Sequence, residues 1–271
     1  MTMPVISRIS VQKHNKERYS VFIDSAKGEE YAFSVDEDVL IKYQLKKGME
    51  LDDLSVTEML YQDDIRKAYN LAINYLARRM RSEEEIREHL RQKEVDETVI
   101  QEAVHRLYEY KFLNDHEFAS AFVRTQMNSA DKGPELIKAE LKKKGIKQQI
   151  IIEAIAEYPL EAQIEKAVYL GSKFAAKNSR DSSKILKQKL EQHLLRKGYP
   201  FQVINIAMEE IIVEKQEDLE MDALKYQGDK LLKKHANLTG SEFRRKIKQG
   251  LFNKGFSFDL IDKYLNSLEL E

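Results

Sequence analysis

The sequence predicts a mainly α-helical protein: an elongated array of tandem three-helix-bundle repeats that follows a small N-terminal β domain, a β-meander with a short helix. Two observations predict this class. One pattern of apolar residues recurs four times after residue 60, and the first 60 residues have a different, strand-like texture. Leucine, lysine and glutamate dominate the remainder, which contains few glycines and prolines, as expected for helices.

The repeat is aligned on four lysines, Lys93, Lys144, Lys197 and Lys254, which are 51, 53 and 57 residues apart. Apolar residues stand seven and three positions before each lysine: Ile86 and Leu90, Ile137 and Leu141, Leu190 and Leu194, Ile247 and Leu251. Apolar pairs also stand six and seven positions after it: Val99-Ile100, Ile150-Ile151, Val203-Ile204 and Leu260-Ile261. A further apolar residue stands eleven positions after the lysine, at Val104, Ile155, Met208 and Leu265. The spacing of four before the lysine, and of four between positions seven and eleven after it, places these residues on the facing sides of two amphipathic helices.

A glycine follows the lysine in three of the four copies, at Gly145, Gly198 and Gly255. Glycine is the residue best suited to the left-handed position that ends a helix. The first copy has Glu94 instead, so we expect its turn to be strained or closed differently.

A further helical run precedes each pair, at 64–80, 115–127, 160–176 and 219–235, which completes three helices per repeat. Ser82 to Glu85 and Thr239 to Glu242 are interpreted as capping boxes, and Pro134 suits a first helical turn. Before residue 60, the segments 6–11, 19–23 and 31–35 predict a three-stranded meander, followed by a short helix over 36–45. The predicted domains are therefore 1–60, 61–113, 114–158, 159–214 and 215–271.

Composition excludes several classes of protein. The chain has no cysteine, and its uninterrupted aliphatic runs, such as Ile150 to Ile152, do not exceed three residues, so we expect no disulfide, no membrane span and a cytoplasmic location. The segment Gly250 to Ser257 departs from a phosphate-binding loop and instead matches the helix end of the repeat. His89 and His193 precede equivalent leucines, which favours boundary positions over metal ligands. The sequence therefore predicts no enzyme, no cofactor and no metal.

Basic residues gather on the second helix of each repeat and at its end, although the net charge of the chain is only −1. The candidate partner- and DNA-binding residues are Arg79, Arg81, Arg87, Arg91, Lys138, Lys142, Lys143, Lys144, Lys187, Lys189, Arg196, Lys197, Arg244, Arg245, Lys248 and Lys254.

The third helix is poor in cations, which argues against a helix-turn-helix that reads the major groove. Two interpretations of the basic residues remain. The lysines at the four turns complement helix C-termini, or the clusters form a basic stripe that suits a phosphate backbone or an acidic protein groove without base specificity. Tyr108, Tyr110 and Phe112 are interpreted as packing between repeats, with base stacking as the alternative.

These residues resemble the RecX family, the regulatory proteins of the bacterial recombinase RecA. The resemblance covers residues 65 to 160 most fully, and its second repeat is carried by Phe112 to Asp115, Phe118-Ala119, Val123-Arg124, Gly133-Pro134, Ile137, Leu141 and Lys144 to Ile146. Its first repeat is carried by Ala72, Tyr75-Leu76, Arg79, Arg81-Ser82, Glu85-Ile86 and Leu90. Asn114 stands where the family usually has aspartate, and a fourth repeat and the N-terminal β region both go beyond the family's three-repeat minimum.

The resemblance implies a monomeric, non-enzymatic modulator that lies in the groove of the RecA filament on single-stranded DNA. It would hinder filament growth, ATPase and strand exchange, and contact the DNA through the filament. The alternative from another class is a general nucleic-acid-binding protein that acts without RecA.

Overall fold

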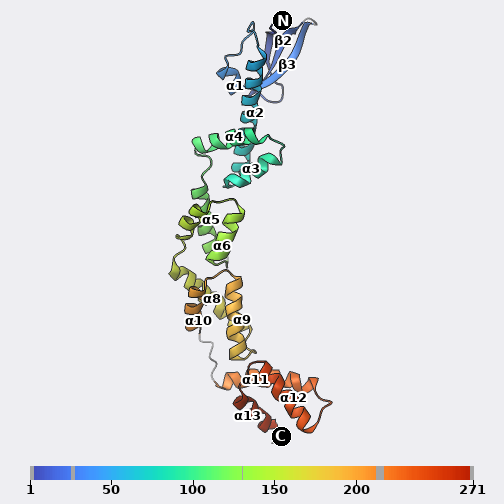
Figure 1. The fold of residues 1–271 in the computed structure, drawn as a ribbon, viewed down its shortest axis with the longest axis vertical. Helices are drawn as coiled ribbons and strands as arrows, with labels where there is room; N and C mark the ends of the chain where they lie inside the picture. Colours follow the sequence, from blue (N-terminus) through green and yellow to red (C-terminus); the bar gives the residue numbers. More distant parts are fainter. Residues whose placement is uncertain (1–2, 26–27, 130, 212–216, 269–271) are drawn as a thin grey trace. The chain divides into compact units, whose positions relative to one another are not determined.

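The computed structural model describes residues 3–25, 28–129, 131–211 and 217–268, and the chain divides into two compact units. The first unit comprises residues 1–118 and 144–146, and the second comprises 119–143 and 147–271. Helices dominate both units, and the one sheet of the described chain lies in the first unit (Figure 1).

The N-terminal domain is the predicted meander. Strands β1 (Val5–Val11), β2 (Arg18–Ser25) and β3 (Gly28–Asp36) pair antiparallel in the order β1-β2-β3. Alternation of apolar and polar residues buries Ile6, Val21 and Val35 on one face. These residues form a separate apolar cluster with the short helix α1 (Glu37–Lys42) and Met59.

Helix α2 (Asp53–Leu76) serves both the β domain and the first three-helix bundle (Figure 1). Its first half packs Met59 into the β cluster, and its second half packs Ile65, Ala68 and Ala72 into the bundle. The helix was expected to begin at residue 64 but begins eleven residues earlier, because Asp52 accepts a hydrogen bond from the amide of Ser55 and caps it there. One continuous helix therefore joins the two parts of the first unit.

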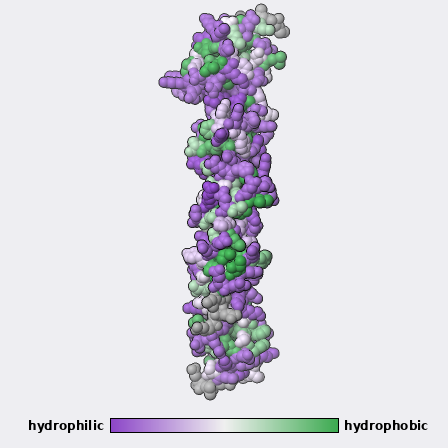
Figure 2. Space-filling model, turned by 90° about the vertical axis from the view of Figure 1, so that its left-hand side faces the viewer, coloured by the Kyte–Doolittle hydropathy of each residue, from purple (hydrophilic) through white to green (hydrophobic). Residues whose placement is uncertain are grey.

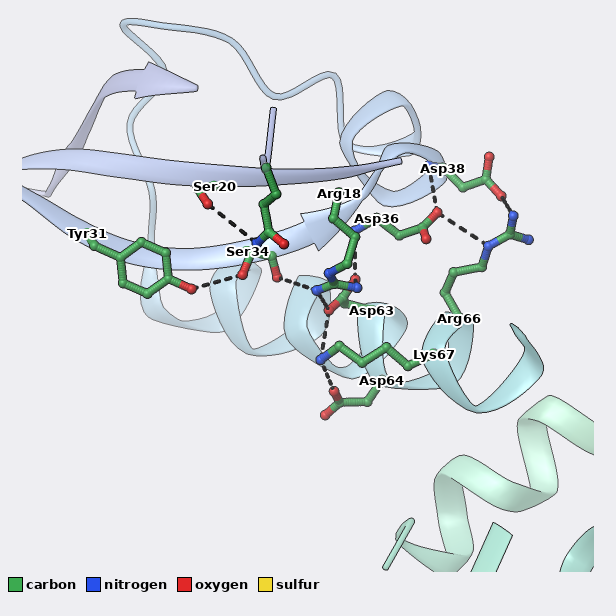
Figure 3. Close-up of polar contacts among 11 residues, drawn as sticks. Arg18, Ser20, Tyr31, Ser34, Asp36, Asp38, Asp63, Asp64, Arg66 and Lys67 are labelled. Carbon is green, nitrogen blue, oxygen red and sulfur yellow. Dashed lines mark hydrogen bonds and ion pairs between the residues drawn. The ribbon is translucent and has the colours of Figure 1, made fainter. Parts of the chain in front are cut away.

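A buried ionic network also fixes α2 to the sheet (Figure 3). The Asp63 side chain is fully buried and accepts hydrogen bonds from Arg18 Nη2 at 2.8 Å and from the Asp36 amide at 2.7 Å, while Lys67 Nζ lies 2.9 Å away. Burial alone would raise the pKa of Asp63, but these donors outweigh it, and the pKa is lowered.

The four predicted helix triplets are confirmed, and each has its expected internal order. They are α2, α3 (Glu83–Arg91) and α4 (Glu97–Glu109); α5 (Asp115–Ser129), α6 (Pro134–Lys143) and α7 (Gln148–Ile155); α8 (Leu160–Lys177), α9 (Ser183–Arg196) and α10 (Phe201–Glu210); and α11 (Glu217–Lys234), α12 (Gly240–Asn253) and α13 (Phe258–Leu268). The boundary expected between residues 214 and 215 lies outside the described residues.

The aligned apolar positions are core positions. All eight residues at seven and three positions before the lysine are fully buried. Leu90, Leu194 and Leu251 belong to three separate apolar clusters, one in each of their repeats. The recurrence in the sequence therefore reflects repeated small cores, as in other repeat proteins.

The turns after the second helices adopt the predicted left-handed conformation, with φ of 78° at Gly145, 83° at Gly198 and 86° at Gly255. Glu94 adopts φ of 60° in the first repeat, so the same turn forms there with a strained residue. The Val95 amide still donates to the Leu90 carbonyl, which closes the helix end in the usual way.

Replacing Glu94 with glycine is expected to stabilise the first unit by roughly 0.5–1 kcal/mol. Glycine removes the left-handed strain, and its greater conformational freedom in the unfolded chain offsets part of that stabilisation. Thermal unfolding of the full chain, followed by hydrogen exchange in α3 and α4, measures the change. Glu94→Ala is the control and should give no gain. Equal stability of the two variants would contradict the assignment of strain.

The capping box predicted at Ser82 is present, with both of its hydrogen bonds. The one predicted at Thr239 is wrong, because the Thr239 side chain makes no capping bond. Gly240, the first residue of α12, has φ of 61°, which is not the right-handed helical conformation. The Thr239 hydroxyl is therefore not placed to accept a hydrogen bond from the amides of the first turn.

Candidate interaction surface

Acidic neighbours balance the predicted basic residues of the first repeat. Arg79 lies 3.1 Å from Glu85, and Arg87 lies 2.7 Å from Glu83. Arg91 pairs with Glu84 and Glu97, both at 3.1 Å, and hydrogen bonds to these two carboxylates raise its pKa. These arginines are fixed in place by their own repeat, and little of their charge is left for a partner.

Arg81 has a different environment, because its guanidinium lies 4.0 Å from the centre of the Tyr75 ring. His89 stacks on the same ring at 4.0 Å, and His193 stacks on Phe174 at 4.4 Å in the third repeat. Both histidines are half-buried, and burial together with nearby cations lowers their pKa values. The predicted boundary positions are confirmed for both.

Among the predicted basic residues of the second repeat, two have no carboxylate partner among the described residues and two are paired. Lys138 pairs with Glu135 at 2.8 Å, and Lys144 pairs with Glu85 at 2.9 Å. Lys142 and Lys143, in the last turn of α6, are exposed and have no carboxylate partner among the described residues.

The third and fourth repeats show the same mixture. Lys189 lies 2.7 Å from Asp181, Lys197 lies 4.0 Å from Asp131 and Lys248 lies 2.7 Å from Asp262, while Arg244 donates to Asn266. The other candidates of these repeats are Lys187, Arg196 and Arg245, which are exposed, and Lys254, which is half-buried. Cations therefore occur in every repeat, but a single stripe along the chain stays a prediction.

The aromatic residues in the last turn of α4 and just after it do not pack as expected. Tyr69, in the helix α2 of the same repeat, contacts Tyr110 and Phe112 edge-to-face at 6.1 and 6.4 Å. The Tyr108 hydroxyl donates to Glu83, and burial raises the pKa of Tyr108. These contacts all lie within the first repeat, and Lys111, with φ of 61°, marks the end of its third helix.

Residues that the sequence did not single out form contacts between consecutive repeats. We call the residue before each second helix and the first turn of that helix the helix-start site. In the first unit, the Ser82 hydroxyl donates to the Lys144 carbonyl at 2.7 Å, and the Glu83 amide donates to Asp115 at 2.9 Å. The next repeat thus supplies acceptors to the start of α3, where helix amides lack partners.

The second unit repeats this arrangement at the start of α9. The Ser182 hydroxyl donates to the Lys254 carbonyl at 2.6 Å, and the Ser183 amide donates to Glu220 at 3.0 Å. At the start of α6, backbone groups alone join the helix-start site to the next repeat. The Gly133 amide donates to the Lys197 carbonyl at 2.7 Å, and the Glu135 amide donates to the Gly198 carbonyl at 3.0 Å.

The glycine of each turn is therefore needed for space as well as for conformation. A Cβ at Gly145, Gly198 or Gly255 would lie 2.4 to 2.6 Å from atoms of the preceding helix-start site. A pattern in the sequence indicates this contact: a small residue precedes each second helix, and a glycine follows the second helix of the next repeat.

The cavities of the described residues are surface grooves with volumes of a few hundred Å³. The groove beside α4, of about 420 Å³, is lined by Glu83, Arg87, Gln101, Glu102, Val104, His105 and Tyr108. Within the described residues, no group of three or more His, Cys, Asp or Glu side chains has the arrangement of a metal site. No described helix is both long and apolar enough to cross a membrane. On the face in Figure 2, hydrophilic residues predominate and apolar residues form separate small patches.

Fold and surface together define a tandem three-helix-repeat protein with a fused β domain. Family models agree along the chain: the regulatory protein RecX N-terminal domain matches residues 4–52, and the first and second three-helix domains of RecX match 68–107 and 114–155. The third three-helix domain matches twice, at 161–208 and 218–265. The chain belongs to the RecX family.

Curated relatives and solved structures carry the same name. The regulatory protein RecX of Bacillus subtilis strain 168 is 45% identical over 98% of this chain and the whole of its own length, and that of Bacillus velezensis is 44% identical with the same coverage. A crystal structure of regulatory protein RecX has a TM-score of 0.69 and 32% identity, and covers 76% of this chain and all of its own. RecX from Lactobacillus salivarius has a TM-score of 0.54 and 38% identity, and covers 56% of this chain and 99% of its own.

Proposed function

We propose that this protein is a non-enzymatic inhibitor of the RecA recombinase. It binds in the groove of the RecA filament on single-stranded DNA and limits filament extension, ATP hydrolysis and strand exchange. The observation that carries the proposal is the match to every RecX domain in chain order, with near-complete coverage of regulatory relatives.

The surface chemistry supports this function. Each repeat offers a few cations beside carboxylates, so a single repeat would bind weakly to phosphates or acidic side chains. Four linked repeats add their contacts, because each binding event raises the effective concentration of the next.

The assay that tests the proposal is ATP hydrolysis by RecA on single-stranded DNA, with and without the full chain. We expect the rate to fall as the protein is added. Titrations of free single-stranded and duplex DNA at two salt concentrations distinguish the alternative, a general nucleic-acid-binding protein. Tight and steeply salt-dependent binding without RecA, combined with an unchanged ATPase rate, would favour that alternative.

Lys142 and Lys143 supply the sharpest variant, because no carboxylate among the described residues holds them. Reversing both charges to glutamate is expected to raise the concentration of protein that halves the ATPase rate by about tenfold, which corresponds to about 1.4 kcal/mol of binding free energy.

The matched control is Lys46→Glu with Lys47→Glu, which changes the net charge equally at an exposed lysine pair of the β domain. The control should inhibit like the unchanged chain. If both double variants lose the same potency, net charge accounts for the effect and the end of α6 has no special role.

A further inference from the structure

A groove of about 580 Å³ lies where the end of α9 meets the start of α6, and both helices belong to the second unit. It is larger than the groove beside α4 and has the size of a small-molecule site, about 300–1,000 Å³. One apolar side chain lines it, together with five ionisable ones: Leu136, and Asp131, Lys132, His193, Arg196 and Lys197. We call it the junction groove.

Positive charge exceeds negative charge around the junction groove. Lys132 has its own carboxylate partner, 2.5 Å away. Asp131 lies 3.8 Å from Lys166 and 4.0 Å from Lys197, which is beyond hydrogen-bond distance for both. Arg196 is exposed and has no carboxylate partner among the described residues. Three cations thus share one carboxylate, which leaves an excess of two positive charges.

The negative end of α9 is already balanced by another helix. Cations in the last turn of a helix normally stabilise the negative end of its dipole. Here the carbonyls of Lys197 and Gly198 accept hydrogen bonds from the amides of Gly133 and Glu135, at the positive end of α6. The side chains of Arg196 and Lys197 are therefore available to an anion from outside the chain.

His193 forms one wall of the groove and senses the same positive charge. Its imidazole stacks on Phe174 at 4.4 Å, which holds the ring in place. Burial lowers the pKa of His193, and Lys197 and Arg196 lower it further, while Asp131 acts in the opposite direction without cancelling them. At neutral pH the groove therefore presents a flat, uncharged ring beside two cations.

A nucleotide of a single strand matches this combination. Its phosphate supplies the negative charge and the oxygen acceptors that suit an arginine beside a lysine. Its sugar and base suit the apolar side chain of Leu136 and the ring of His193, because unpaired bases stack on flat side chains. An acidic side chain of a protein would satisfy the cations but would leave most of the groove unfilled.

We propose that the junction groove binds one nucleotide of single-stranded DNA, with the phosphate on Arg196 and Lys197 and the sugar or base against Leu136 and His193. This inference rests on the proposed function, because it names a direct contact between the chain and the DNA of the filament. It also assigns a role to a histidine that the search for metal ligands set aside.

Fluorescence anisotropy of a labelled single-stranded oligonucleotide, titrated with the full chain without RecA over a range of low salt concentrations, tests the site. Arg196→Gln with Lys197→Gln should weaken binding about tenfold. The slope of log affinity against log salt should become shallower by about 1.4, because each phosphate contact to a single strand contributes about 0.7.

The matched control is Lys233→Gln with Lys234→Gln, an exposed lysine pair in the last turn of α11 in the same unit. It should bind the oligonucleotide like the unchanged chain. Ultraviolet cross-linking of the unchanged chain to an oligonucleotide with 5-iododeoxyuridine makes the test independent of how the variants fold. Mass spectrometry should locate adducts at His193.

Three outcomes overturn the nucleotide site: an unchanged affinity and slope in the Arg196 and Lys197 double variant, an equal loss in the control, or adducts confined to helices other than α9. A double variant that loses binding to RecA filaments but not to free DNA also overturns it, because the groove then holds an acidic group of RecA. The RecA ATPase assay judges the proposed function separately. Inhibition by the unchanged chain leaves that function standing whatever the groove binds.

Discussion

Replacing Asp63 with alanine is expected to lower the free energy of unfolding of the first unit by about 3 kcal/mol. The substitution leaves the Arg18 guanidinium, which is only 16% exposed, without its counter-charge, and it leaves the Asp36 amide without an acceptor. Removal of one partner from a buried ion pair typically costs about 3–5 kcal/mol, and the partial exposure of Arg18 and Lys67 places this case at the lower end.

Asp64→Ala is the matched control, because its carboxylate is 56% exposed and pairs with the same Lys67. It should cost less than about 1 kcal/mol. Hydrogen exchange of amides in β2 and α2 reports the first unit directly, which avoids treating a chain of two units as a single transition. Similar exchange in the two variants would show that burial of Asp63 adds nothing.

The Asp63 network also sets a pH dependence. Because the folded-state pKa of Asp63 is lowered, its contribution is complete above the unfolded value of about 3.9 and is lost as the pH falls through the folded value. Acidification below about pH 4 should therefore open β2 and α2 in the unchanged chain. The same acidification should change the Asp63→Ala variant less.

Replacing Gly198 with alanine is expected to cost about 3 kcal/mol and to separate the helix end at Lys197 from the start of α6. Left-handed strain contributes about 1 kcal/mol. A Cβ at 2.6 Å from Leu136 Cγ and 2.7 Å from its amide nitrogen contributes about 2 kcal/mol through forced displacement. Exchange of the Gly133 and Glu135 amides, which donate across this contact, should accelerate.

Two further glycines separate the causes. Gly48 has φ of 86° with open space around it, so Gly48→Ala measures backbone strain alone. Gly133 has no positive φ, but a Cβ added there would lie 2.4 Å from the Gly198 carbonyl group, so Gly133→Ala measures crowding alone. If Gly198→Ala costs no more than Gly48→Ala, close approach of the two repeats contributes no stability.

The repeated fold could be predicted because the same residues are buried four times for the same reason. Leu90 and its three counterparts are fully buried, and the strands of the N-terminal domain follow from simple alternation. The extent of α2 was missed because its first half has no counterpart in the other repeats, so alignment of the copies gave no information there.

The surface was less predictable because charge in the sequence does not reveal its partners. Arg87 and Arg91 look like binding residues until Glu83, Glu84 and Glu97 are placed beside them. The contacts between repeats were missed because they join residues about 60 or 70 positions apart, such as Ser82 with Lys144 and Ser182 with Lys254. Only the fold brings such pairs together.

The third RecX three-helix model matches this chain twice, and the contacts between the two matched repeats include Ser182 with the Lys254 carbonyl, Ser183 with Glu220, and Gln227 with the Arg180 carbonyl. The hydrogen bonds of this junction are made by polar side chains and backbone groups rather than by the core residues of either repeat. Duplication of one repeat could therefore lengthen an ancestral chain in a single event, without compensating changes in any core, and selection could adjust the number of repeats independently of their stability.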